Sequence, residues 1–93
     1  MITSPRPNLY ESPEGFSVEV LGITGLRYRE GDRTMFIDSE VLAGPSGMVV
    51  YRDSIKKWEP PHEDEKITEA DRERILENIR EVFRCQGFEI AVI

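Results

Sequence analysis

The sequence predicts an α+β fold, in which an antiparallel-rich β-sheet of four to six strands packs against one C-terminal amphipathic helix, with a final strand after the helix. Three observations favour this class. Residues 16–51 contain short segments of alternating or continuous apolar residues separated by glycines. Residues 68–84 instead repeat apolar residues at helical spacing, and residues 88–93 return to alternation. A chain of 93 residues is long enough for one small domain.

The first strands are indicated by alternation and by a glycine turn. Every second residue from 16 to 20 is apolar, which is the period of a half-buried strand. Gly31-Asp32 separates LRYRE from RTMFID and suits a two-residue type II′ hairpin. The hairpin register predicts three facing pairs, namely Glu30–Arg33, Tyr28–Met35 and Leu26–Ile37. On the other face Arg27 would lie opposite Phe36.

The second half of the sheet is expected after a turn at GPSG, residues 44–47. Residues 48–51, MVVY, are apolar on both faces, as in a central strand covered on two sides. Residues 52–58 either extend this strand or form a short helical turn, because Ile55 and Trp58 also match helical spacing; we favour the strand. Pro60-Pro61 ends the element.

The helix has a predicted start, face and stop. Thr68 with Asp71 resembles a capping box, and Gly87 supplies a left-handed C-terminal stop. One apolar stripe follows helical spacing: Ile75, Leu76, Ile79, Val82 and Phe83. FEIAVI, residues 88–93, is predicted to form the last strand, with Phe88, Ile90 and Val92 on one face.

Residues 1–15 contain three prolines and few core formers, so we expect a flexible N-terminal tail before a single domain at residues 16–93. No apolar signal segment or membrane-length stretch occurs, and the lone Cys85 has no internal disulfide partner. A cytoplasmic protein fits these features best. The net charge of −6 disfavours nucleic acid and membranes and favours a basic protein partner.

The acidic loop, residues 59–65, is the candidate site. It contains Glu59, His62, Glu63, Asp64 and Glu65, and Trp58 precedes it. A metal site usually needs several His or Cys ligands, and this chain has one of each, so we predict no metal and no cofactor. A Cys85–His62 catalytic pair is disfavoured, because Cys85 falls near the helix C-terminus, where the macrodipole disfavours a thiolate. We therefore predict that the protein is not an enzyme.

Two charged surfaces have an alternative, structural interpretation. Arg27, Arg29 and Phe36 would share a sheet face that could stack single-stranded nucleic acid, although six acids within residues 16–58 offset the six basic residues there. Glu69, Glu73, Glu77 and Glu81 recur every four residues on the helix. Arginines project between these acids, which favours a self-paired face with i,i+3 pairs Glu69–Arg72, Asp71–Arg74, Glu77–Arg80 and Glu81–Arg84.

Trp58 also has two interpretations. It either fills the space between sheet and helix or contacts a partner, and we favour the core because a large apolar side chain beside a proline pair is more often buried.

Residues 54–83 resemble the immunity protein 74 family of bacterial polymorphic toxin systems. The resemblance rests on Ser54-Ile55, on Trp58 followed by the proline pair, on the acidic loop and on the Ile75-x-x-Asn78-Ile79 helix pattern. The upstream Ile37, Asp38 and Glu40 agree, and the similarity extends over about residues 26–93.

The resemblance implies a non-catalytic cytoplasmic protein that binds and neutralises a cognate toxin. The acidic loop with Trp58 is then the expected contact, and a basic toxin domain the expected partner. The alternative is a small accessory domain that binds another protein, or single-stranded nucleic acid through Arg27, Arg29 and Phe36.

Overall fold

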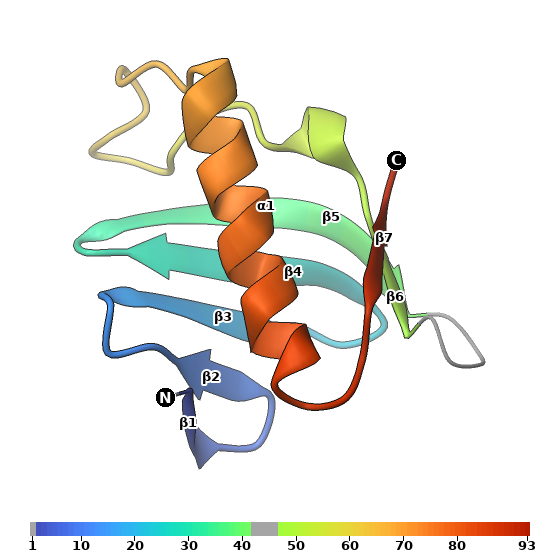
Figure 1. The fold of residues 1–93 in the computed structure, drawn as a ribbon. Helices are drawn as coiled ribbons and strands as arrows, with labels where there is room; N and C mark the ends of the chain where they lie inside the picture. Colours follow the sequence, from blue (N-terminus) through green and yellow to red (C-terminus); the bar gives the residue numbers. More distant parts are fainter. Residues whose placement is uncertain (1, 42–46) are drawn as a thin grey trace.

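One sheet and one long helix form the protein in the computed structural model, which describes residues 2–41 and 47–93 (Figure 1). Within these residues the sheet has seven strands, and their spatial order follows the chain from β1 to β7. The elements are β1 (Thr3–Arg6), β2 (Leu9–Glu11), β3 (Phe16–Val20), β4 (Thr24–Glu30), β5 (Arg33–Val41), β6 (Met48–Val50), the 3-10 helix η1 (Arg52–Ser54), α1 (Glu69–Arg84) and β7 (Ile90–Val92). The predicted fold class is confirmed, with more strands than expected.

The central hairpin forms in the predicted register. β4 and β5 are antiparallel and pair Glu30 with Arg33, Tyr28 with Met35, Leu26 with Ile37, and Arg27 with Phe36. Gly31 has a φ of 64°, which the first position of a type II′ turn requires and which costs glycine little. The alternation of β5 therefore buries Met35 and Ile37 against α1 and turns Phe36 to the opposite face.

The N-terminal segment differs from the flexible tail that we expected at residues 1–15. Residues 3–6 and 9–11 form β1 and β2, and β2 pairs antiparallel with β3. Asn8 takes a φ of 67° in the turn between them, and its carbonyl accepts a hydrogen bond from Val20 N at 2.8 Å. Pro5 fits because β1 is an edge strand, whose outer N–H groups need no partner.

Residues 52–58 do not form the strand that we favoured. Arg52–Ser54 form η1, whose turn is closed by hydrogen bonds from Ser54 N to Tyr51 O at 3.0 Å and from Ile55 N to Arg52 O at 3.1 Å. Ser54 Oγ also accepts from Asp38 N at 2.9 Å, so the serine hydroxyl replaces a strand partner for β5. The turn predicted at 44–47 lies largely outside the described residues.

The predicted helix boundaries are confirmed. Thr68 and Asp71 form a reciprocal capping box, and Gly87 has a φ of 83° after the helix. All five residues of the apolar stripe are buried against the sheet, together with Val18, Leu26, Tyr28, Met35 and Ile37. α1 lies across one face of the sheet, and among residues 2–41 and 47–93 no other α-helix covers the opposite face (Figure 1).

The last strand is shorter than predicted. β7 spans Ile90–Val92 and pairs in parallel with β6. Phe88 is excluded because its N–H donates to the Phe83 carbonyl at 3.0 Å and so closes the helix end. β6 consequently lies between β5 and β7, with Met48 and Val50 buried and Val49 half-buried.

Candidate functional site

The acidic loop joins the sheet to α1 and is anchored at its start by Trp58. The indole is 4% exposed, and its ring stacks on Tyr28 with centroids 6.3 Å apart. Tyr28 in turn stacks on Phe16 at 6.2 Å. The core interpretation of Trp58 is therefore confirmed, and its ring is not available to a partner in this structure.

Glu59 is tied to the open edge of β5. Its N–H donates to the Thr34 carbonyl at 2.8 Å. Its carboxylate accepts from Arg27 and from the Thr34 hydroxyl, each at 2.7 Å. These contacts lie on the sheet face turned away from α1, which we call the outer face. Glu59 thus closes the loop onto the sheet.

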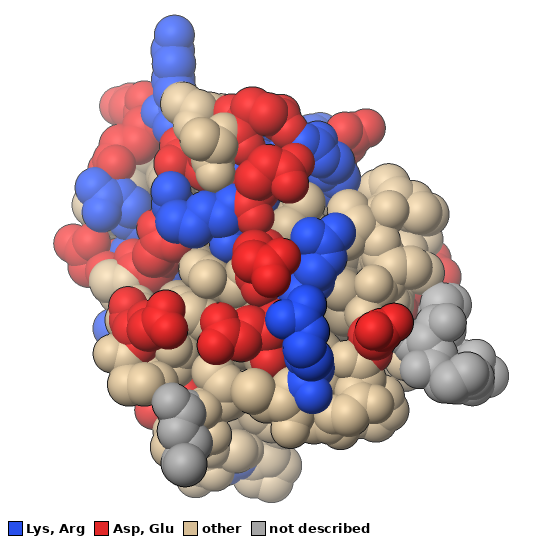
Figure 2. All heavy atoms as spheres, viewed as in Figure 1, with Lys and Arg blue, Asp and Glu red and all other residues tan. Residues whose placement is uncertain are grey.

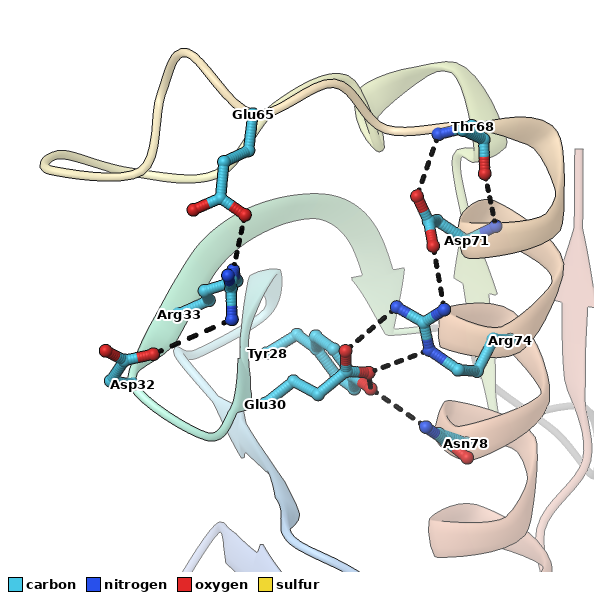
Figure 3. A network of polar contacts seen from close by, with 9 residues as sticks. All are labelled: Tyr28, Glu30, Asp32, Arg33, Glu65, Thr68, Asp71, Arg74 and Asn78. Carbon is cyan, nitrogen blue, oxygen red and sulfur yellow. Dashed lines mark hydrogen bonds and ion pairs between the residues drawn. The ribbon is translucent and has the colours of Figure 1, made fainter.

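The far end of the acidic loop is tied to the β4–β5 hairpin. Arg33 donates to Glu65 at 2.8 Å (Figure 3). His62 Nδ1 lies 2.7 Å from the other Glu65 oxygen. His62 Nε2 lies 3.6 Å from Asp32. The Arg33 hydrogen bond lowers the pKa of the Glu65 carboxyl, and Glu65 raises the pKa of Arg33. Glu65 and His62 therefore hold the loop in place.

Glu63 and Asp64 are the exposed acids of the acidic loop. Among the described residues neither carboxylate takes part in an ion pair. Of the six predicted contact residues, these two remain free to meet a partner, while Trp58, Glu59, His62 and Glu65 are engaged within the protein.

A second polar network fastens α1 to the end of β4 (Figure 3). Arg74 donates to both Glu30 oxygens at 2.8 and 3.1 Å and to Asp71 at 2.7 Å. Tyr28 donates its hydroxyl proton to Glu30 at 2.7 Å and accepts from Asn78 at 2.9 Å. The network satisfies the buried tyrosine and links the helix cap to the sheet.

The electrostatics of this network indicate a structural role. Burial raises the pKa of the Tyr28 hydroxyl far above its usual value, with Glu30 adding to the effect. The hydrogen bond from the Thr68 backbone, followed by the Arg74 contact, lowers the pKa of Asp71. Groups with these shifts keep one protonation state near neutral pH, so they do not exchange protons with a substrate there.

The structure separates the two residues that were weighed as a nucleophile pair. His62 precedes α1, whereas Cys85 follows it at the exposed C-terminal end. A helix of 16 residues spans about 24 Å. Within residues 2–41 and 47–93 no group of three or more His, Cys, Asp or Glu side chains could hold a metal ion.

The possible nucleic-acid platform is partly neutralised. Arg27 and Phe36 face each other as predicted, and Arg29 lies two residues along the same strand. Arg27, however, is paired with Glu59, which places a carboxylate on the platform. The ion pair weakens the attraction that a phosphate backbone needs.

The helix surface carries paired charges, as predicted. Glu69–Arg72, Asp71–Arg74 and Glu77–Arg80 form i,i+3 pairs at 2.7, 2.7 and 3.5 Å. Arg84 lies 3.8 Å from Glu77 instead of pairing with Glu81, and Arg52 of η1 contacts both Glu69 and Glu73. Figure 2 shows acidic and basic side chains interleaved over α1.

These observations define a small single-sheet α+β protein whose internal ion pairs hold a helix and a loop onto the sheet. The family model described as immunity protein 74 (Imm74) matches residues 21–93. The chain belongs to this family of immunity proteins. No curated protein and no solved structure matches the chain. Among the described residues, no helix is long and apolar enough to cross a bilayer.

The network between Glu30 and Arg74 was not predictable from the sequence. These residues are 44 positions apart, and nothing in the local sequence relates them. Asp38 and Glu40 continue the alternation of Phe36 along the outer face of β5, although they were not predicted to form a surface. That alternation is a signal that could have identified them.

Proposed function

We propose that this protein is a cytoplasmic, non-catalytic immunity protein that binds a cognate bacterial toxin and so neutralises it. The observation that carries the proposal is the Imm74 match over residues 21–93. The net charge of −6 supports a basic toxin domain as partner, because opposite charge speeds the encounter of two proteins.

The acidic loop is the contact that we propose from the sequence, now with separate roles for its residues. Trp58 fixes the start of the loop in the core, while Glu59 and Glu65 hold it onto Arg27 and Arg33. Glu63 and Asp64 would then meet basic groups of the toxin. A loop held at both ends loses little conformational freedom on binding, which favours affinity.

Co-expression with the matching toxin tests the proposal. The probe is the C-terminal domain of the toxin-like protein encoded beside this gene, expressed from an inducible promoter in a host without other immunity proteins. We expect growth to stop when the toxin domain is induced alone and to be restored with this chain. The purified proteins should also elute together in size-exclusion chromatography.

A host that stays inhibited in the presence of folded, abundant immunity protein would contradict the proposal. So would rescue without any complex between the purified proteins. The nucleic-acid alternative predicts retention on single-stranded DNA at moderate salt, whereas our proposal predicts that the chain passes through the column.

A further inference from the structure

The outer face of β5 presents an aromatic ring and two carboxylates in one line. Burial alternates along this strand, so Met35, Ile37 and Ser39 face the core while Phe36, Asp38 and Glu40 are exposed. Phe36 is 46% exposed, a large exposure for an aromatic ring on a sheet. Side chains two residues apart on a strand point the same way, so these three groups form one surface.

The backbone beneath Phe36 fixes the position of its ring. Gly25 lies on β4 beside a register shift between Thr24 and Leu26 and has a φ of 93°. A Cβ at this glycine would lie 2.5 Å from Phe36 Cε2, so the ring occupies the space that a side chain would fill. Ser39 Oγ accepts from Gly25 N at 3.0 Å and stabilises the irregular pairing. Phe36 is therefore a prepositioned aromatic group.

Asp38 and Glu40 differ from most acids on the helix side. Those acids are paired with arginines of α1, η1 or β5, whereas among the described residues neither Asp38 nor Glu40 forms an ion pair. The hydroxyl of Tyr51, the residue that follows β6, donates a hydrogen bond to Glu40, and this bond raises the pKa of Tyr51. The Asp38 backbone is held by Tyr51 N at its carbonyl and by Ser54 Oγ at its N–H. Among the described residues no cation therefore neutralises either carboxylate, although Glu40 already accepts one hydrogen bond from Tyr51.

A hollow of about 350 Å³ adjoins Phe36 on the side of the acidic loop. It is lined by Phe36, Ser54, Lys56, Lys57, Trp58, Glu59, Pro60 and Glu63. Its lining includes the exposed ring of Phe36 and the residue Pro60, so it suits an apolar side chain. Lys56 and Lys57 add positive charge to the hollow. Asp38 and Glu40 follow Phe36 along β5 and provide the negative charge of the surface.

We infer that the cognate toxin domain docks on this outer face of β5, inserting an apolar side chain into the hollow beside Phe36 and placing basic side chains against Asp38 and Glu40. The inference rests on the proposed function and assigns it a surface. Charge complementarity supports a basic toxin domain as the partner here. Asp38 and Glu40 have no arginine partner among the described residues, so a basic side chain of the toxin would bind them more strongly than it would bind a carboxylate already paired with arginine. The site also lies on strands and on a loop tied at both ends, so it is preorganised.

Binding of the purified toxin domain, the same probe as in the neutralisation test, measures the contribution of this surface by isothermal titration calorimetry. We expect Asp38→Lys combined with Glu40→Lys to weaken binding about 100-fold, because like charges would then face each other. Phe36→Ala should weaken binding about 30-fold, as for a central aromatic anchor. Glu63→Lys, at the hollow, should weaken binding more than Asp64→Lys, which lies outside its lining.

The matched control is Glu11→Lys combined with Glu14→Lys, which makes the same charge change at two exposed acids near β2. It should alter affinity by no more than about threefold, since long-range charge effects are small at physiological salt. Circular dichroism melting confirms that each variant is folded. The charge variants should melt within a few degrees of the parent, and Phe36→Ala should melt about 4–16 °C lower, as its expected stability loss of about 1–2 kcal/mol requires.

Two results overturn the assignment while leaving the proposed function intact. One is unchanged affinity of the folded Asp38→Lys, Glu40→Lys variant. The other is an equal loss in the Glu11→Lys, Glu14→Lys control, which would mean that only net charge matters. Failure of the parent protein to bind the toxin domain would instead overturn the proposed function, and the docking surface with it.

Discussion

Replacing Trp58 by alanine tests whether the acidic loop is anchored through the core. The ring is 4% exposed, and burial of a tryptophan removes about 150–250 Å² from water. At about 25 cal/mol per Å² this burial contributes about 4–6 kcal/mol. That figure is an upper bound, because the unfolded chain already buries part of its apolar surface. We therefore expect a loss of about 3–5 kcal/mol, which is typical of Trp→Ala in a core.

The loss is large for a domain of this size. A chain of 93 residues has a free energy of unfolding of about 5–14 kcal/mol. A loss of about 4 kcal/mol should lower the melting temperature by about 15–30 °C. Circular dichroism is the appropriate measurement, because Trp58 is the chain's single tryptophan and the variant has no indole fluorescence.

Two variants make the result specific. Trp58→Phe keeps a ring against Tyr28 and should recover more than half of the loss. Phe36→Ala removes a ring that is 46% exposed and should cost about 1–2 kcal/mol. A Trp58→Ala variant within about 1 kcal/mol of the parent would refute the reasoning, because the loop would then be anchored by its ion pairs and not by the indole.

Three further predictions concern the hydrogen bonds and the backbone. Tyr28→Phe loses both hydrogen bonds of the buried hydroxyl and should lower the free energy of unfolding in urea by about 1–3 kcal/mol. The folded pKa of Asp71 lies below its ordinary 3.8. The contribution of its carboxylate to the free energy of unfolding is therefore present above pH 3.8 and is lost as pH falls through the folded pKa. Asp71→Asn should be less stable than the parent at pH 7, and the stability difference should shrink in titrations towards pH 2. Gly25→Ala should be more destabilising than Gly31→Ala in thermal melts, because both have positive φ but only the new Cβ at Gly25 would meet Phe36; equal losses would contradict the packing argument.

The sequence by itself determined the elements whose signals are local. The hairpin register follows from a glycine turn and alternating residues, so Tyr28 and Met35 pair as predicted. The boundaries and buried stripe of α1 follow from the capping box, the 3.6-residue period and Gly87. The composition and position of the acidic loop were also readable, although the pairing of its charges was not.

The tertiary structure decided the features that depend on distant partners. Residues 3–11 form strands because β3 offers a free edge, and no periodicity within that proline-rich segment announces this. Arg74 reaches Glu30, and Glu59 reaches Arg27, only after α1 and the acidic loop fold onto the sheet. Local spacing determines which face a side chain takes on its own element. The packing of the elements decides which surfaces stay open to a partner. α1 covers one face of the sheet, and Phe36, Asp38 and Glu40 remain exposed on the other face.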